Sequence, residues 1–158
     1  MEQEHKNKEG ISLKGHVEIF TRNLKTGKTR KICEGHNVIT DSADYLIAQW
    51  IAGMSRTTEI THCAIGTGST AESASQTALV TEVYRTGIGS LHTGGASSRD
   101  VISETSFGSL EANGSTIYEA GLFTAASGGT MISRFKFASS VTKTVNIELI
   151  VKWTITCG

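Results

Sequence analysis

The strongest constraint on the fold is a strict alternation of apolar and polar side chains near the C-terminal end. The apolar positions between residues 145 and 155 are Val145, Ile147, Leu149, Val151, Trp153 and Ile155. Successive side chains of a β-strand point to opposite faces, so this period of two predicts a long strand with one buried face. A strand of this kind requires a sheet around it.

A β-hairpin is predicted near the start of the chain. The segment from Gly15 alternates, residues 23–27 (NLKTG) supply turn chemistry, and residues 28–33 are typical of a return strand. We expect residues 35–37 (GHN) to end the hairpin.

One substantial helix is predicted over residues 41–52. Thr40 or Asp41 can cap it, because a side-chain oxygen there accepts a hydrogen bond from a free N–H of the first turn, and Gly53 lies near its end. Residues three or four apart form its apolar face, and they are Ala43, Leu46, Ile47, Trp50 and Met54.

The central stretch, residues 60–85, predicts a core strand, a glycine-rich bend at residues 66–68 and a return strand that carries an exposed Arg85. Proline is absent from the chain, so the turns depend on Gly, Asn, Asp and Ser. Further turns are predicted at residues 92–100, 110–115 and 127–129.

These segments together predict a mainly β protein with seven to nine antiparallel strands. We expect a jelly-roll-like antiparallel β-sandwich with one short amphipathic helix. At 158 residues the chain is long enough for one core. Residues 14–158 are predicted to form a single domain, and residues 1–13, which are polar and without periodicity, an N-terminal arm.

The formal net charge is zero, which argues against attraction to nucleic acid or to an anionic membrane. The charge is unevenly distributed, since residues 1–31 carry eight Lys and Arg against four Glu, whereas the remaining chain is acidic. The basic N-terminal segment of one subunit can attract the acidic remainder of a neighbouring subunit.

Cys33, His36, His62 and Cys63 are residue types that bind zinc. His62 and Cys63 are consecutive, so on a strand they point to opposite faces and the set lacks a ligand unless Cys157 completes it. We therefore expect no metal site. Three scattered cysteines also argue against a secreted disulfide framework and favour a reducing cytosol, although Cys157 is a candidate for an intermolecular disulfide.

No catalytic or cofactor-binding residues are predicted. Gly66 to Ser69 has the glycines of a phosphate-binding loop but lacks the Lys-Ser/Thr pair and the helix that follow in such loops. The chain contains no Gly-x-Ser-x-Gly elbow, and nothing fixes the distance between carboxylates such as Glu111 and Glu119.

Isolated charges in a charge-poor half of the chain are candidates for contacts between subunits, with simple exposure to solvent as the alternative. We place the interface in the arm, in the bend at residues 66–76 and in the loop at residues 92–100. The predicted interface residues are Lys6, Lys8, Thr67, Ser69, Arg85, His92, Arg99 and Arg134.

Five ordered stretches within residues 34–156 carry a resemblance, and they read EGHNVITDSADYLIAQWIAG, ITHCAIGTGSTAESASQTALVTEVYR, FGSLEANGSTIYEAGLF, SGGTMISRFKF and KTVNIELIVKWTIT. They resemble a group of small structural proteins of tailed bacteriophages. In that group a helix precedes an A-x-G-T-G strand end, a T-A-L-x-x-E-x-x-R return, an E-A-G-L-F strand and a final W-x-I strand. Ala71-Glu72 departs from the group, where a proline is expected.

The resemblance implies a non-enzymatic virion protein that is made in the bacterial host cytoplasm. It would form a homo-oligomer, a trimer or a larger ring, and contact other virion proteins at the tail, collar, baseplate or fibre attachment. The arm or an edge strand would add to a neighbour's sheet.

A capsid decoration (cement) protein is one alternative. The other is a module that binds a host glycan, which would require an exposed Trp or Tyr, whereas Trp50 and Trp153 lie on faces predicted to be buried.

Overall fold

The computed structural model describes residues 12–54 and 59–158, and nine strands and one helix lie within them. In chain order they are β1 (Leu13–Asn23), β2 (Thr29–Ile39), α1 (Asp41–Ile51), β3 (His62–Gly66), β4 (Glu82–Gly87), β5 (Ser90–Gly94), β6 (Asp100–Phe107), β7 (Thr116–Phe123), β8 (Met131–Thr142) and β9 (Ile147–Cys157).

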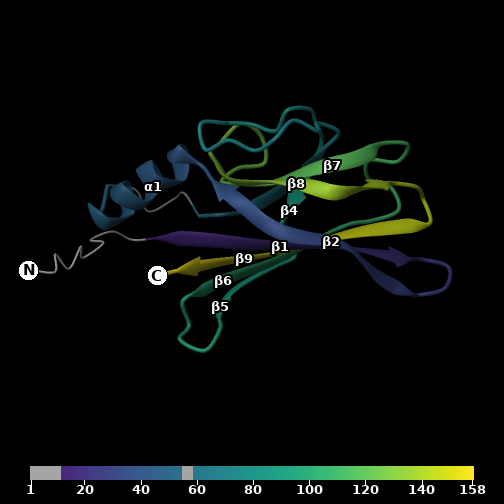
Figure 1. Ribbon diagram of the computed structural model, residues 1–158, viewed down its shortest axis with the longest axis horizontal. Helices are drawn as coiled ribbons and strands as arrows, with labels where there is room; N and C mark the ends of the chain where they lie inside the picture. Colours follow the sequence, from purple (N-terminus) through teal and green to yellow (C-terminus); the bar gives the residue numbers. More distant parts are fainter. Residues whose placement is uncertain (1–11, 55–58) are drawn as a thin grey trace, which may run out of the picture.

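The nine strands form one curled antiparallel sheet in the order β4-β3-β7-β8-β2-β1-β9-β6-β5 (Figure 1). Its two ends meet, since the rings of Tyr84 in β4 and Phe107 in β6 pack edge-on with their centroids 6.3 Å apart. The mainly β, antiparallel prediction is therefore confirmed. The two-sheet sandwich is not confirmed, because strand pairing is unbroken from β4 to β5 and the curl of a single sheet encloses the core.

The two edge strands of this sheet, β4 and β5, follow each other directly in the chain. Between them the Ile88 N–H donates to the Thr61 carbonyl and the Gly89 N–H donates to the Glu104 carbonyl, each at 3.0 Å. Ile88 and Gly89, which connect the two edge strands, are thus hydrogen-bonded to residues at both ends of the sheet.

The core lies inside the curl, where apolar side chains of one half of the sheet face those of the other. Strands β1, β6 and β9 contribute from one half, and β3, β7 and β8 from the other. Fully buried members of this core include Val17, Ile19, Ile65, Phe107, Ile117, Leu122, Leu149 and Trp153.

The alternation predicted for the last strand is confirmed over most of its length. Leu149, Val151, Trp153 and Ile155 are buried. The prediction is wrong for Val145, which is 59% exposed in the turn between β8 and β9. This turn packs against the tip of the β1–β2 hairpin, where the carbonyl of Asn146 accepts a hydrogen bond from the N–H of Leu24 at 2.8 Å.

The first hairpin is confirmed, with β1 and β2 joined by a turn in which the Asn23 side chain accepts from the N–H groups of Lys25 and Thr26. Pairing of β2 with β1 stops at Asn37, the last of the three residues predicted to end the hairpin, while β2 itself continues to Ile39. The last two residues of β2 pair with β8 and connect the two halves of the sheet. Gly35 allows this because Phe135 packs directly against it.

Helix α1 begins and ends close to its predicted limits. The hydroxyl of Thr40 accepts from the Ala43 N–H at 3.3 Å, and Gly53 ends the helix in the left-handed conformation. Ala43 and Leu46 are buried, but Trp50 and Met54 are 40% and 77% exposed. The described residues therefore bury the N-terminal half of the predicted apolar face but leave its C-terminal half partly exposed to solvent.

The central stretch folds as predicted into β3, a bend and the antiparallel return strand β4. The glycine turns near residues 110–115 and 127–129 and the hairpin of β5 and β6 are also present. Of the predicted arm, residues 1–11 lie outside the described residues. Leu13 begins β1, and the Gly158 N–H donates to the carbonyl of Ser12.

Leu149 and Val145 provide a direct test of the position of the core. We expect Leu149→Ala to lower the free energy of unfolding by about 2–5 kcal/mol, because it leaves a cavity in the core. Val145→Ala is the control and should change it by no more than about 0.5 kcal/mol. Urea denaturation measures both, and equal losses would contradict the placement of Val145 in an exposed turn.

Candidate functional site

An apolar groove lies beside helix α1. It has a volume of about 460 Å³. We call it the α1 groove, and its lining residues are Leu13, Ala43, Ile47, Trp50, Ile51, Glu59, Ile60, Leu91, Val101, Ile132, Ile155 and Cys157.

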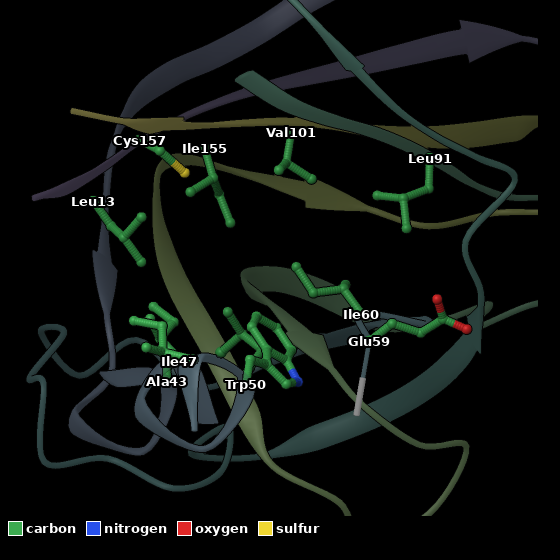
Figure 2. Close-up of a pocket in the computed structure, with 12 residues that line it drawn as sticks. Leu13, Ala43, Ile47, Trp50, Glu59, Ile60, Leu91, Val101, Ile155 and Cys157 are labelled. Atoms are coloured by element: carbon green, nitrogen blue, oxygen red, sulfur yellow. The ribbon is translucent and has the colours of Figure 1, made fainter. Parts of the chain in front are cut away.

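The groove forms where the helix crosses the open end of the curled sheet. Figure 2 shows Leu13, Ile155 and Val101 on one side and Ile47 and Trp50 on the other, with open space between them. The first set comes from β1, β9 and β6, and the second from α1.

The lining of the groove is chemically uniform. Glu59 is the one charged residue in it, and its carboxylate lies at the margin of the group of side chains in Figure 2. Two of the lining residues are also open to solvent, since Ile51 is 71% exposed and Leu91 is 42% exposed. Exposed apolar surface gathered around a concavity is typical of a site for binding another molecule.

A second distinctive surface lies at the opposite end of the molecule, at the tip of the β1–β2 hairpin (Figure 1). Leu24 is 42% exposed there, and the neighbouring turn presents Val145. Three exposed cations, Lys25, Lys28 and Arg30, belong to the same turn and the start of β2, with no acid in residues 23–30. We call these five residues the knob.

Arg85, one of the predicted interface residues, acts within the chain. Its guanidinium forms two bonds to the carboxylate of Glu82 and donates to the carbonyls of Ala125 and Gly128. It also lies 3.6 Å from the ring centroid of Phe123, and its side chain is only 9% exposed. The prediction of an exposed arginine is therefore wrong, because these contacts fix Arg85 against the β7–β8 turn.

Arg134 is also an internal residue. It is fully buried, and its Nε donates to the carboxylate of Glu119 at 2.8 Å, while Nη1 and Nη2 donate to Gln76 and to the Thr70 carbonyl. No part of its side chain is left for a neighbouring subunit. This corrects the interface prediction for Arg134.

The Gly66 to Ser69 bend resembles an anion-binding loop because it does surround an anion, the Glu119 carboxylate. That group accepts from the N–H groups of Gly68, Val80 and Thr81 at 2.8–3.0 Å. A Cβ on Gly66 or Gly68 would collide with the same carboxylate. The glycines are thus required by an internal ligand, and the loop has no room there for a phosphate.

The remaining predicted interface residues fall into separate places. Thr67 is half-buried and Ser69 exposed in the bend after β3, whereas His92 on β5 and Arg99 in the β5–β6 loop are exposed. Lys6 and Lys8 lie outside the described residues. Cys157 lines the α1 groove, and its N–H donates to the Arg99 carbonyl at 3.0 Å.

The zinc-type set of cysteines and histidines is not brought together by the fold. Cys33 and His36 contact the backbone carbonyls of Ser139 and Gly15, and His62 contacts the Thr61 hydroxyl. Cys63 is fully buried, and burial raises the pKa of its thiol to about 12. Within residues 12–54 and 59–158, the metal-ligand types gather at a different place, on β1 and β2.

Comparison with family models, with curated proteins and with solved structures gives no match to this chain. In the described residues no helix is long and apolar enough to cross a membrane. The function must therefore be argued from the site itself.

Sequence reasoning missed the α1 groove, although one signal for it was present. The apolar face of α1 continues to Trp50, yet the loop that follows offers few apolar residues to cover it. The knob also carried a signal, since residues 23–30 combine three cations with a single leucine.

Glu119 and Glu82 both pair with an arginine and differ in burial. Glu119→Gln should lower the free energy of unfolding by about 3–5 kcal/mol, because it leaves the buried Arg134 guanidinium without its counter-charge. Glu82→Gln is the control and should cost less, because Glu82 is partly exposed and Arg85 keeps its hydrogen bonds to the carbonyls of Ala125 and Gly128. Thermal or urea denaturation decides between them, and a small effect of Glu119→Gln would contradict the assigned role.

The three cysteines should differ in reactivity with iodoacetamide near pH 8. We expect the half-buried Cys33 and Cys157 to be alkylated in the folded protein and Cys63 to be protected, because a buried thiol with a raised pKa forms almost no thiolate. Peptide mass spectrometry before and after denaturation measures the three sites. Early alkylation of Cys63 would contradict its burial.

Proposed function

We propose that this chain is a non-enzymatic structural protein of a tailed bacteriophage particle, and that it assembles by inserting the knob of one copy into the α1 groove of the next. The assembly would lie at the tail, collar, baseplate or fibre-attachment region and contact other virion proteins. The observation that carries the proposal is the presence of an apolar groove and a projecting apolar tip on one chain.

The positions of the two surfaces favour this arrangement. Helix α1, which lines the groove, and the β1–β2 turn, which carries Leu24 of the knob, lie at opposite ends of the long axis in Figure 1. A contact between groove and knob therefore joins different patches on the two copies. Such a heterologous contact repeats from copy to copy and gives a ring when the rotation closes. A ring is one of the homo-oligomers that the resemblance implies.

The chemistry of the two surfaces is complementary. Leu24 and Val145 offer apolar side chains to a lining that is apolar. Lys25, Lys28 and Arg30 lie in or beside the β1–β2 turn, whereas Glu59 lies at the groove, on the part of the chain that has an acidic balance. Opposite charges around an apolar centre orient the partners and exclude the reversed contact.

The bacteriophage assignment rests on the resembling stretches of the sequence, several of which meet at Glu119. Glu119 belongs to the E-A-G-L-F stretch, and it binds the amides of the A-x-G-T-G and T-A-L-x-x-E-x-x-R stretches and the arginine of ISRFKF. The stretches therefore act as parts of one folding unit.

A carbohydrate-binding module is favoured by one observation, the 40% exposure of Trp50 beside the groove. Binding of a sugar also requires polar groups that pair with its hydroxyls. Since Glu59 is the one charged lining residue and the rest are apolar apart from the indole N–H and the thiol, we place this function second. A capsid decoration protein has the same surface chemistry and differs in its copy number per particle.

The molar mass of the full-length chain in solution tests the assembly, by light scattering over a range of concentrations. We expect an oligomer that becomes monomeric in Leu24→Asp, which puts a charge into the knob, and in Ile51→Asp, which puts one beside the groove. Both positions are exposed, so the fold should persist. Leu110→Asp is the matched control, because Leu110 is 90% exposed and belongs to neither surface.

Mixing the two variants separates this contact from a symmetric one. Leu24→Asp keeps a normal groove and Ile51→Asp keeps a normal knob, so an equimolar mixture should form a heterodimer, while each variant alone stays monomeric. A wild-type chain that is monomeric at all concentrations, or a mixture that does not associate, would overturn the proposed contact.

A further inference from the structure

A group of metal-binding side chains lies across β1 and β2. Within residues 12–54 and 59–158 it is the one set of three His, Cys, Asp or Glu residues whose ligand atoms all lie within 4.8 Å of one another, and its members are His16, Glu18 and Glu34. Glu18 is directly opposite Glu34 in the ladder, and His16 is two residues before Glu18. All three therefore project from the same face of the sheet.

This group already holds a positive charge between two carboxylates. Like charges directly opposite each other in a ladder are unfavourable, and here the ammonium of Lys31 compensates for them. Its Nζ lies 2.7 Å from Glu18 Oε1 and 2.8 Å from Glu34 Oε2. The Lys31 side chain is 42% exposed and flexible, so the ammonium can move into solvent and leave its place to another cation.

The imidazole of His16 lies at the distance that a shared metal ion requires. Its Nε2 is 3.3 Å from Glu34 Oε2, close to the separation of two ligands on a tetrahedral zinc ion with bonds of about 2.0–2.1 Å. His36, directly opposite in the ladder, packs edge-on against His16 with ring centroids 5.7 Å apart. Its own Nδ1 lies 3.2 Å from the Gly15 carbonyl, which holds the pair of rings in place.

We propose that His16, Glu18 and Glu34 bind a zinc ion, and that the ammonium of Lys31 leaves the site when the ion enters. One imidazole and two carboxylates are suitable ligands for zinc, and three protein ligands leave a fourth position for water. The ion joins β1 to β2 along the part of the hairpin where β8 does not pair with β2. This proposal is independent of the α1 groove.

Calorimetric titration of the full-length chain with Zn²⁺ tests the site. We expect one equivalent to bind, and Kd to rise at least tenfold in His16→Ala and in Glu34→Gln. His92→Ala is the matched control, since His92 is exposed on another strand, and it should retain the wild-type Kd. Circular dichroism confirms that each variant is folded.

Lys31→Ala gives the result that distinguishes this site from unspecific surface binding. The Kd should fall in this variant, because the competing ammonium is gone while all three ligands remain. A repeat of the titration in the Leu24→Asp background excludes an ion shared between two copies. Binding that persists in His16→Ala and Glu34→Gln, or that weakens in Lys31→Ala, would overturn the proposal, as would the absence of binding to the wild-type chain.

Discussion

The fold depends on a single carboxylate, that of Glu119, which is completely buried in β7. A buried charge is costly unless it is paired and hydrogen-bonded. Three backbone amides and the Arg134 guanidinium meet this requirement, and they come from the bend after β3, the segment before β4 and strand β8. One side chain thus defines the path of a long loop that has little apolar content of its own.

The same network reaches helix α1 and so determines where the groove is. Arg134 donates to Gln76 and to the Thr70 carbonyl, which places the loop beside the helix. There the Ala74 carbonyl accepts from the N–H of Asp41, the first residue of α1. The position of α1 over the open end of the sheet therefore follows from a polar cluster, whereas the surface that α1 exposes is apolar.

Local signals predicted those elements whose structure is determined locally. The alternation that includes Leu149 and Trp153 and the cap at Thr40 needed no knowledge of distant residues. Val145, Trp50 and Arg134 were misplaced because their environment is supplied by residues far away in the chain. Val145 follows the alternation but lies in a turn whose Asn146 carbonyl accepts a hydrogen bond from Leu24. Trp50 lies on the apolar face of the helix but remains 40% exposed. Arg134 is isolated in the sequence, and nothing near it indicates that its buried partner is Glu119. The α1 groove arises from five strands and the helix together, so no single segment contained it.

Strands β1 and β9 are paired along their full length, from Leu13 opposite Cys157 at the groove end to Asn23 opposite Ile147 at the knob end. Hydrogen bonds of an antiparallel pair are perpendicular to the strands. A force transmitted from the groove to the knob would therefore act in shear on this whole ladder, and its bonds would have to break together. A chain of such subunits joined end to end would resist stretching, a mechanical property that follows from the register of two strands.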